Sequence, residues 1–584
     1  MTVLEEPVNA VGTDTADGAA ERSEVAPRVD FDAGPERYRH WRFTVDGETA
    51  WVYLDVAEDG GIVDGYELKL NSYDLGVDIE LYDLTQRLRF EYPQVRSVVL
   101  TSGKDSNFCA GANIRMLAGS SHPWKVNFCK FTNETRNGIE DMTDAGQVWL
   151  AALNGTAAGG GYEMALACDH ILLVDDRSSA VSLPEVPLLG VLPGTGGLTR
   201  VIDKRRVRKD RADVFATKSE GFGGRKAVEW KLVDEAVPRR EWDRVVAERA
   251  AEAAARSSRP ADAQGIALTP LHREETADSL TYDHVRVTLD RDARTATVVV
   301  AVPDELTDDP AALHEQGAAH PLLAIVRELD DAILRLRSNE LEIGTWLLLT
   351  EGSTDAALAA DRLIAAQQDD WLVAETTRYL KRVLKRLDVT SRSLIALIEP
   401  GSCFAGPFLE LALACDRQYM LEGVFEEDED ATLPSGAAAQ DPATIVVTDA
   451  QFGTFPMGNG LTRLGSRFYG DDEALEAVRA RTGEQLTGGD ADDLGLVTDA
   501  PDDIDWTDEI RILLEERASL SPDALTGMEA NHRFVGPETM ETRIFGRLTA
   551  WQNWIFVRPN ASGPEGALRK YGTGRKADFD HRRV

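Results

Sequence analysis

The chain has 584 residues, of which 43% are hydrophobic and 28% are charged, and its formal net charge at pH 7 is −37. This length is too great for one hydrophobic core and predicts about three or four folded units. The excess of negative charge argues against nucleic acid or an anionic membrane as a partner. The five cysteines, Cys109, Cys129, Cys168, Cys403 and Cys415, lack the spacing of zinc ligands, so we expect neither a metal site nor a disulfide framework.

The N-terminal segment does not resemble a targeting sequence. Its first residues, MTVLEEPVNAVG, lack the basic end and apolar run of a signal peptide, and no run of 18 apolar residues follows in the chain. We therefore expect a cytoplasmic protein. Residues 1–36 are rich in Ala, Asp, Glu and Gly and offer little to bury, which predicts a disordered leader.

After the leader, strand and helix patterns alternate. The segments WRFTVDG and TAWVYLDV predict two strands joined by a turn at Asp46 and Gly47. Ile79 to Phe90 has helical spacing, and short apolar strands are predicted at Val95–Leu100 and Trp149–Leu153. Repeated strand-then-helix units indicate an α/β domain with both sheet faces covered, which we predict over residues 37–257.

Three motifs in this domain combine tight turns with carboxylates. They are FCAGAN (residues 108–113), NGTAAGGGYEMALACD (154–169) and SLPEVPLLGVLPGTGG (182–197). The glycine triplet 159–161 lets the backbone approach a ligand, and the helix after it points unpaired N–H groups there. Glu163 and Glu185 add two carboxylates. Each feature alone is explained by a turn or a helix start, but together they suit proton transfer beside a carbonyl oxygen that becomes negative.

The chain then repeats itself beyond a linker predicted at residues 258–280. The segment YDHVRVTLDRDARTATVVVAV, from Tyr282, aligns with YRHWRFTVDGETAWVYLDV, from Tyr38. Likewise, GSCFAGPFLELALACD aligns with GTAAGGGYEMALACD. The period of about 245 residues is far longer than that of solenoid repeats. It predicts a second, related domain over residues 281–502, followed by a helical C-terminal region over residues 503–584.

The repeat departs from its template where the chemistry is expected. Pro407 stands opposite Gly160, and proline has no N–H to donate. Thr448 stands opposite Glu185, and the FCAGAN turn is replaced by AALAAD around Ala357. Only the glutamate opposite Glu163 is retained, as Glu410. Its retention indicates that a glutamate at this position also has a role in the helix itself. We predict that the first domain is catalytic and that the second is a degenerate scaffold.

In their order and spacing, FCAGAN, NGTAAGGGYEMALACD and PEVPLLGVLPGTGG resemble the signature of the crotonase (enoyl-CoA hydratase/isomerase) superfamily. The resemblance implies the α/β crotonase (ClpP/crotonase-like) fold, here duplicated, with a helical C-terminal region. It implies an oxyanion hole made by the N–H groups of Ala112 and Gly160, and acid–base work on water by Glu163 and Glu185. Cys109 is a further candidate in the pocket, although a buried free cysteine usually serves packing.

The resemblance also implies a site for coenzyme A beside the first turn. Lys69 stands where crotonases place a basic residue near the CoA adenosine and phosphates, and the basic cluster that begins with Lys204 and Arg205 is a second candidate. A solvated helix face explains that cluster equally well. Ala110 and Asn113 complete the expected CoA-binding residues. No metal or cofactor is implied, because CoA is part of the substrate.

Longer segments, among them LKLNSYDLGVDIELYD and ETRIFGRLTAWQNWIFVRPNA, resemble one branch of this superfamily from about Tyr38 to Val584. The branch is a group of carbon–carbon lyases of aerobic benzoate degradation that act on an aromatic acyl-CoA. They convert 2,3-epoxy-2,3-dihydrobenzoyl-CoA and two waters to 3,4-dehydroadipyl-CoA semialdehyde and formate. The alternatives are a hydratase or isomerase of another acyl-CoA and a non-catalytic acyl-CoA-binding scaffold. The resemblance further implies a homo-oligomer, which we expect to be a dimer.

Overall fold

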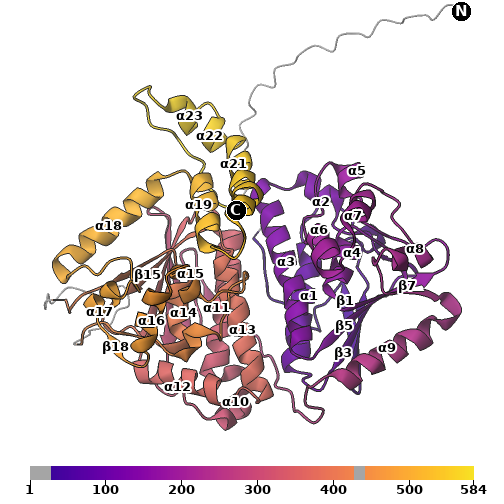
Figure 1. Cartoon of the computed structure of the whole chain (residues 1–584), viewed down its shortest axis with the longest axis horizontal. Helices are drawn as coiled ribbons and strands as arrows, with labels where there is room; N and C mark the ends of the chain where they lie inside the picture. Colours follow the sequence, from indigo (N-terminus) through magenta and orange to yellow (C-terminus); the bar gives the residue numbers. More distant parts are fainter. Residues whose placement is uncertain (1–27, 426–440) are drawn as a thin grey trace, which may run out of the picture.

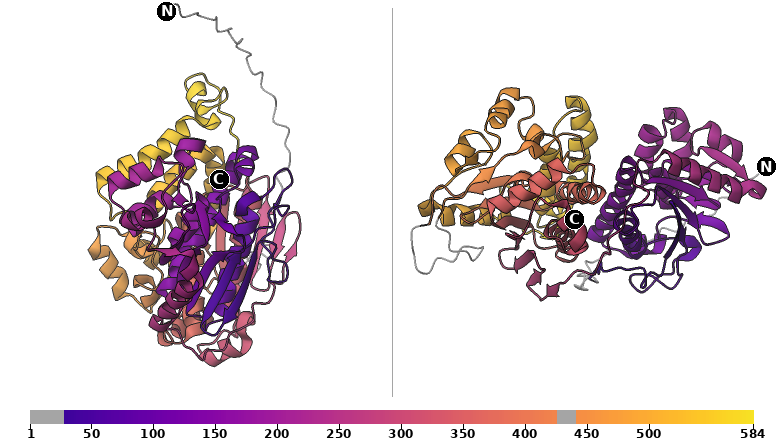
Figure 2. Two further views of the ribbon diagram at one scale, coloured as in Figure 1. Left: turned by 90° about the vertical axis from the view of Figure 1, so that its right-hand side faces the viewer. Right: turned by 90° about the horizontal axis from the view of Figure 1, so that it is seen from below.

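The computed structural model describes residues 28–425 and 441–584. Two α/β halves lie side by side, and the last helices of the chain stand at one end of the boundary between them (Figure 1). The right panel of Figure 2 shows the same side-by-side arrangement from below. Residues 1–27 of the expected leader lie outside the described residues.

The first half is built on a six-stranded sheet in the order β1-β2-β3-β5-β7-β9. Its strands are β1 (Trp41–Asp46), β2 (Thr49–Leu54), β3 (Ser97–Ser102), β5 (Val148–Leu153), β7 (His170–Asp175) and β9 (Glu235–Pro238). The pair β1–β2 is antiparallel, as the predicted turn at Asp46 and Gly47 requires, and all later pairs are parallel. The predicted alternation of strand and helix is confirmed.

Helices cover both faces of this sheet. They are α1 (Leu75–Phe90), α2 (Ile114–Gly119), α3 (His122–Asp144), α4 (Gly160–Ala167), α5 (Glu185–Leu189), α6 (Gly197–Thr199), α7 (Lys209–Ala216), α8 (Gly224–Glu229) and α9 (Trp242–Arg256). The helix predicted from Ile79 starts earlier, because the Asp74 side chain accepts hydrogen bonds from the first N–H groups of α1. α1, α3 and α4 pack on one face, and α9 buries Trp242 and Val246 on the other.

A small second sheet brings the three sequence motifs together. It consists of β4 (Ser106–Cys109), β6 (Gly155–Ala158) and β8 (Val181–Ser182), all parallel. The FCAGAN turn follows β4, the glycine triplet follows β6, and α5 follows β8. Because the carboxyl ends of parallel strands meet at one edge of a sheet, the three motifs become neighbours there.

The second half contains a seven-stranded sheet in the order β10-β11-β12-β13-β14-β15-β16 and the small pair β17–β18. The strands are β10 (Glu274–Glu275), β11 (Ser279–Thr281), β12 (Val285–Asp290), β13 (Thr295–Val302), β14 (Thr345–Gly352), β15 (Ser393–Ile398), β16 (Arg417–Met420), β17 (Ile445–Val446) and β18 (Gln485–Leu486). An antiparallel pair, β12–β13, again precedes parallel strands. The duplicated α/β fold expected from the sequence is confirmed.

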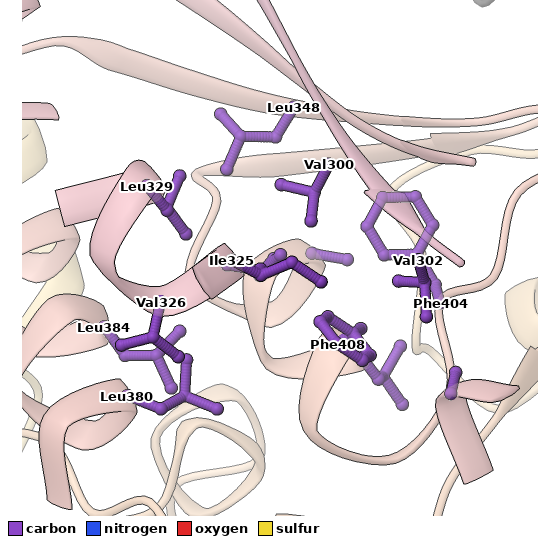
Figure 3. Packing of buried hydrophobic residues seen from close by; sticks show 14 of the residues in the cluster. Val300, Val302, Ile325, Val326, Leu329, Leu348, Leu380, Leu384, Phe404 and Phe408 are labelled. Atoms are coloured by element: carbon purple, nitrogen blue, oxygen red, sulfur yellow. The ribbon is translucent and has the colours of Figure 1, made fainter. Parts of the chain in front are cut away.

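The helices of the second half surround a continuous apolar core. They are α10 (Pro310–Gln316), α11 (Pro321–Asn339), α12 (Thr354–Ala366), α13 (Trp371–Asp388), α14 (Leu409–Leu413), α15 (Arg463–Arg467), α16 (Asp472–Ala480) and α17 (Gly488–Asp493). Figure 3 shows Ile325 of α11 packed between Val300 of β13 and Phe408, which directly precedes α14. Burial of this kind contributes about 25 cal/mol per Å² of apolar surface.

The C-terminal region is helical, as expected: α18 (Asp503–Ser519), α19 (Pro522–Arg533), α20 (Met540–Arg543), α21 (Thr549–Phe556), α22 (Pro559–Ser562) and α23 (Ala567–Lys570). Its first helix completes the second half, because Trp506 and Leu513 of α18 cover the outer sheet face as α9 covers that of the first half. Further along, Trp554 stacks on His122 of the first half at 5.8 Å between ring centroids.

Ion pairs join the two halves where α1 and α3 meet α11 and α13 (Figure 1). Glu134 accepts from Arg337 at 2.7 Å and from Arg386, and Glu375 pairs with Arg89 at 2.8 Å. Burial would raise the pKa of both carboxyls, but the arginines outweigh it and hold the pKa of each at about 2. Both glutamates therefore stay charged, and removing one partner would strand a buried charge.

Two predicted boundaries need correction. Residues 28–36, predicted as part of the disordered leader, are packed against the second half, where Val29 is buried and exchanges two hydrogen bonds with the Asn339 side chain. The predicted linker 258–280 is also packed. Arg259 is buried and pairs with Glu375 at 2.8 Å, and residues from Glu274 onward join the second sheet. Composition alone could not reveal these contacts, because polar segments are held here by ion pairs.

Candidate active site

The FCAGAN turn and the glycine triplet meet directly. Gly111 adopts φ +88°, and a Cβ there would lie 2.9 Å from the nitrogen of Gly160, so only glycine allows this approach. Ala112 lies opposite Tyr73, whose N–H donates to Gly111 O at 3.0 Å and whose carbonyl accepts from Asn113 N at 2.8 Å. This pairing turns the N–H of Ala112 the other way.

Two backbone N–H groups are therefore available at the junction. Gly160 is the first residue of α4, where a helix leaves its N–H groups without intrahelical partners. Among the described residues, the N–H groups of Ala112 and Gly160 have no hydrogen-bond acceptor. An anionic oxygen held between them would also gain from the positive end of the α4 dipole.

Glu163 is buried and held in place. It lies in the first turn of α4 and is 2% exposed. Its Oε1 accepts from the N–H groups of Thr195 at 3.0 Å and Gly197 at 2.7 Å, and its Oε2 accepts from the Thr195 hydroxyl. The loop of the third motif thus fixes the first glutamate, and a Cβ on Gly197 would meet the Glu163 side chain at 2.8 Å.

Glu185 is the more weakly held of the two carboxyls. Its Oε2 is buried without a hydrogen-bond partner, and a Cβ on Gly159 would lie 2.6 Å from its Oε1. Burial, followed by the nearby charge of Glu163, raises the pKa of Glu185 from 4.5 to about 7. A carboxyl with this pKa can both give and take a proton near neutral pH.

The two carboxyls are electrostatically coupled, which gives a first prediction. In Glu163→Gln the negative charge that helps to raise the pKa of Glu185 is gone, so that pKa should fall below about 7. The measurement is a ¹³C NMR titration of the labelled Glu185 carboxyl in both proteins. An unchanged titration curve in Glu163→Gln would contradict the coupling.

The remaining residues of the first turn serve its architecture. Cys109 is buried, its thiol donates to Asn71 O at 3.0 Å, and burial raises its pKa to about 12. This favours packing over the expected participation in chemistry. The Asn113 side chain caps α2 and donates to Glu67 O at 2.8 Å, whereas Ala110 is exposed at the turn.

The expected CoA-binding cations separate into two groups. Lys69 is exposed close to the first turn and pairs with Glu67 at 2.6 Å. Lys204 donates to Ala167 O at the far end of α4, about 10 Å from Gly160, and pairs with Glu140 at 2.9 Å. Arg205 forms a bidentate pair with Asp234 at 2.9 and 3.0 Å. The structure therefore does not bring Lys204 and Arg205 to this site.

The described residues of the second half do not repeat this arrangement. Where the first half has the FCAGAN turn, α12 continues through residues 354–366, so its N–H groups belong to a helix. Glu410 is neutralised by Arg463 at 2.9 Å, and the Thr448 hydroxyl donates to Asp361 at 2.9 Å. Figure 3 shows Phe404 and Phe408 within the apolar core; in the aligned repeat they stand opposite Ala157 and Gly161.

Sequence reasoning missed the residues that support the site from behind. Thr195 was seen only as part of a loop, and its two hydrogen bonds to Glu163 depend on how that loop folds back. Tyr73 and Arg136 are both buried beneath Gly160. Comparison of the two repeats could have identified Arg136, because this charged residue at a buried helical position is replaced by an apolar residue in the second half.

Residues 28–425 and 441–584 offer no candidate for a metal site or a membrane-spanning helix. No group of three or more His, Cys, Asp or Glu side chains is arranged to hold a metal ion. Within the same ranges, no helix has the length and apolar character needed to cross a membrane.

Comparisons with known proteins show which proteins this chain resembles. The enoyl-CoA hydratase/isomerase family model matches residues 68–280. The chain is 27% identical to the fatty acid oxidation complex subunit alpha of Aliivibrio fischeri, over 39% of this chain and 31% of that one. A crystal structure of an enoyl-CoA hydratase from Geobacillus kaustophilus is 32% identical, with a TM-score of 0.33, over 37% of this chain and 75% of that one.

One relative matches almost from end to end. The benzoyl-CoA-dihydrodiol lyase of Aromatoleum evansii is 56% identical over 562 residues, which are 96% of this chain and 99% of that protein. Both motif-bearing halves and the C-terminal helices lie within the matched length. The chain therefore belongs to the benzoyl-CoA-dihydrodiol lyase family, within the enoyl-CoA hydratase/isomerase superfamily.

Proposed function

We propose that this protein is a carbon–carbon lyase that opens the ring of 2,3-epoxy-2,3-dihydrobenzoyl-CoA. With two waters, the substrate yields 3,4-dehydroadipyl-CoA semialdehyde and formate. The observation that carries the proposal is the placement of the Glu185 carboxyl, with one oxygen buried and unpaired, and of Glu163 beside the two unpaired N–H groups of Ala112 and Gly160. Family membership supplies the substrate class.

The chemistry follows from this arrangement. Glu163, fixed by three donors, orients a water, and Glu185 removes its proton as the oxygen attacks an epoxide carbon, whose bond to the epoxide oxygen breaks and leaves a diol. Cleavage of a C–C bond of this diol opens the ring and leaves an aldehyde. The second water adds to an aldehyde carbon, and cleavage of the C–C bond to that carbon releases it as formate. Electrons released on ring cleavage flow through the conjugated system to the thioester oxygen, which the N–H groups of Ala112 and Gly160 bind as it becomes negative. Protonated Glu185 then returns its proton to carbon. Substrate and two waters balance the products, so this scheme uses no external oxidant.

An apolar rim next to Glu185 supports an aromatic acyl group. Val186, Leu188, Val191 and Leu192 follow the carboxyl directly and are exposed, and Ile114 is exposed beside the first turn. Covering such a surface with a benzene-derived ring would remove it from water.

The decisive experiment is formate release from freshly generated 2,3-epoxybenzoyl-CoA. Formate formed in step with a ring-opened CoA aldehyde would support the lyase. Turnover of crotonyl-CoA with no formate would favour a hydratase of another acyl-CoA instead. Binding of benzoyl-CoA without any product would favour a scaffold.

Lys69 is the cation we propose for the CoA phosphates. Lys69→Gln should raise KM several-fold and leave kcat nearly unchanged, because an exposed phosphate contact contributes about 1 kcal/mol. Lys204→Gln is the matched control and should leave KM unchanged, since Lys204 lies at the other end of α4. Steady-state kinetics on both variants test this, and a larger effect of Lys204 would reverse the assignment.

We further propose a homodimer. Several large apolar side chains of the C-terminal helices are exposed in one chain, among them Phe545, Leu548, Phe556 and Val557. A second copy could cover them, and light scattering coupled to size-exclusion chromatography would measure the mass.

A further inference from the structure

Directly behind the candidate oxyanion hole lies a buried ion pair that the proposed chemistry does not use. Arg136 of α3 and Asp78 of α1 are both 0% exposed, and their charged atoms lie 3.6 Å apart. Asp78 also accepts from the Thr132 hydroxyl. A buried ion pair rarely stabilises a fold more than apolar side chains of similar size, so its presence calls for another explanation.

Arg136 reaches the oxyanion hole by two routes. Its guanidinium donates to the Gly160 carbonyl at 3.3 Å and to the Tyr73 hydroxyl at 3.1 Å. Tyr73 in turn supports Gly160 from below, because a Cβ on Gly160 would lie 1.9 Å from the Tyr73 hydroxyl. The peptide on which the oxyanion hole depends is therefore held from behind by a cation and a tyrosine.

The second half supplies an internal comparison. Asp78 stands three residues before Leu81, and its counterpart three residues before Leu329 is Val326. Asp78 contacts Thr132 and Arg136, which lie four residues apart on α3. Figure 3 shows Val326 packed beside Leu380 and Leu384, which lie four residues apart on α13 within one apolar cluster, so the counterpart of Arg136 is Leu384.

The same helix pair thus packs with apolar side chains at these two positions. The fold does not require the ion pair, and the pair occurs in the half that has the two unpaired N–H groups. The second half, where Pro407 replaces Gly160, has lost both the donor and the cation behind it. Arg136 also keeps its Nε buried without a partner, a cost that packing alone does not explain.

We propose that Arg136, paired with Asp78, is a positioning residue for the oxyanion hole. It fixes the Gly160 turn through the Gly160 carbonyl and Tyr73, and it places a positive charge behind the thioester oxygen. Because Arg136 is buried, its charge is weakly screened by solvent and strengthens the field at the oxygen, in addition to the dipole of α4. The inference rests on the proposed function, because it assigns Arg136 to the same site.

The test is the double variant Asp78→Val/Arg136→Leu, which gives the first half the apolar side chains that stand at these two positions in the second half. We expect a folded protein of nearly unchanged thermal stability, because apolar replacement of a buried pair is often neutral. We expect kcat for formate release to fall about 10- to 100-fold, the scale of a small misplacement, with KM changed less than about threefold. Arg136→Lys keeps the charge without the fork of hydrogen bonds and should recover part of the loss.

A second readout separates this inference from the proposed function. The carbonyl stretching frequency of bound ¹³C-labelled benzoyl-CoA reports polarisation at the oxyanion hole without turnover. It should lie lower in the unchanged protein than in the double variant. Arg382→Leu, which removes an arginine paired with Asp141 elsewhere, is the control and should leave the frequency unchanged.

The outcomes are distinct. Equal kcat and equal carbonyl frequency in the double variant would overturn the role of Arg136. Absence of formate from the unchanged protein would overturn the proposed reaction instead, while the carbonyl shift would still decide whether Arg136 acts on the N–H groups. Should the double variant fail to fold, Arg136→Lys carries the same comparison.

Discussion

Replacing Glu185 by glutamine should reduce formate release by about 10²- to 10⁴-fold. The variant keeps the shape of the side chain but loses the group that exchanges a proton near neutral pH. In the unchanged enzyme, kcat/KM should change through an apparent pKa near the value of about 7 that burial and Glu163 give to Glu185. In Glu185→Gln this inflection should be absent, and a pH–rate profile measures it.

The same variant should alter stability in a direction set by that pKa. Because the pKa of Glu185 is raised from 4.5 to about 7 on folding, the stabilising contribution is complete below about pH 4.5 and is lost as the pH rises to 7. Glu185→Gln should therefore match the unchanged protein at pH 4 and exceed it at pH 8 by roughly 3 kcal/mol. Urea denaturation at both pH values tests this.

Glu399→Gln provides a matched control in the second half. Burial raises the pKa of Glu399 to about 7, against a hydrogen bond from Trp506, so the chemical change and the titration range are the same. Formate release should stay within about twofold, because this carboxyl lies far from the first half's N–H groups. A loss of activity equal to that of Glu185→Gln would contradict the assignment.

Gly160→Ala should lower kcat by about 10²- to 10³-fold, the usual loss when one oxyanion donor is displaced. The added Cβ would lie 1.9 Å from the Tyr73 hydroxyl, so either the turn or the ring must move. Both are buried and linked to Arg136, so we also expect a loss of roughly 1 to 3 kcal/mol in stability. Steady-state kinetics and denaturation measure the two effects.

Gly161→Ala separates misplacement of the N–H from general overpacking. Its Cβ would meet the Cys109 side chain at 2.6 Å, so it crowds the neighbouring side of the same helix start. We expect a comparable loss of stability but a smaller loss of kcat. If the two variants lost activity equally at equal stability, Gly160 would not supply the donor.

Much of the fold was predictable because it depends on local patterns. The hairpin at Asp46 and Gly47 follows from turn chemistry, and alternating strands and helices follow from the spacing of apolar residues. Comparison of the repeats was equally informative. Proline at position 407 excludes an N–H donor whatever its surroundings, and the structure adds that α12 replaces the first turn.

The sequence predicted which types of residue the site contains, but not the environment of each side chain. Sequence located Glu163 and Glu185, but the difference between them comes from their neighbours. Thr195 and Gly197 satisfy Glu163, whereas Glu185 is left with a buried oxygen that has no partner. Because pKa depends on burial and on charges distant in sequence, no local pattern fixes it.

The sequence by itself determined the glycine turns, the two carboxylates, the duplicated α/β fold and the departure of the second half from the motifs of the first, because each depends on residue identity. Tertiary structure decided which of the candidate cations lie near the turns of the candidate site. Lys69 and Lys204 look alike in sequence, but Lys69 lies next to the first turn, whereas Lys204 donates to Ala167 O at the far end of α4. It also revealed Arg136 behind Gly160, because contacts between α1, α3 and α4 form only when the chain is folded.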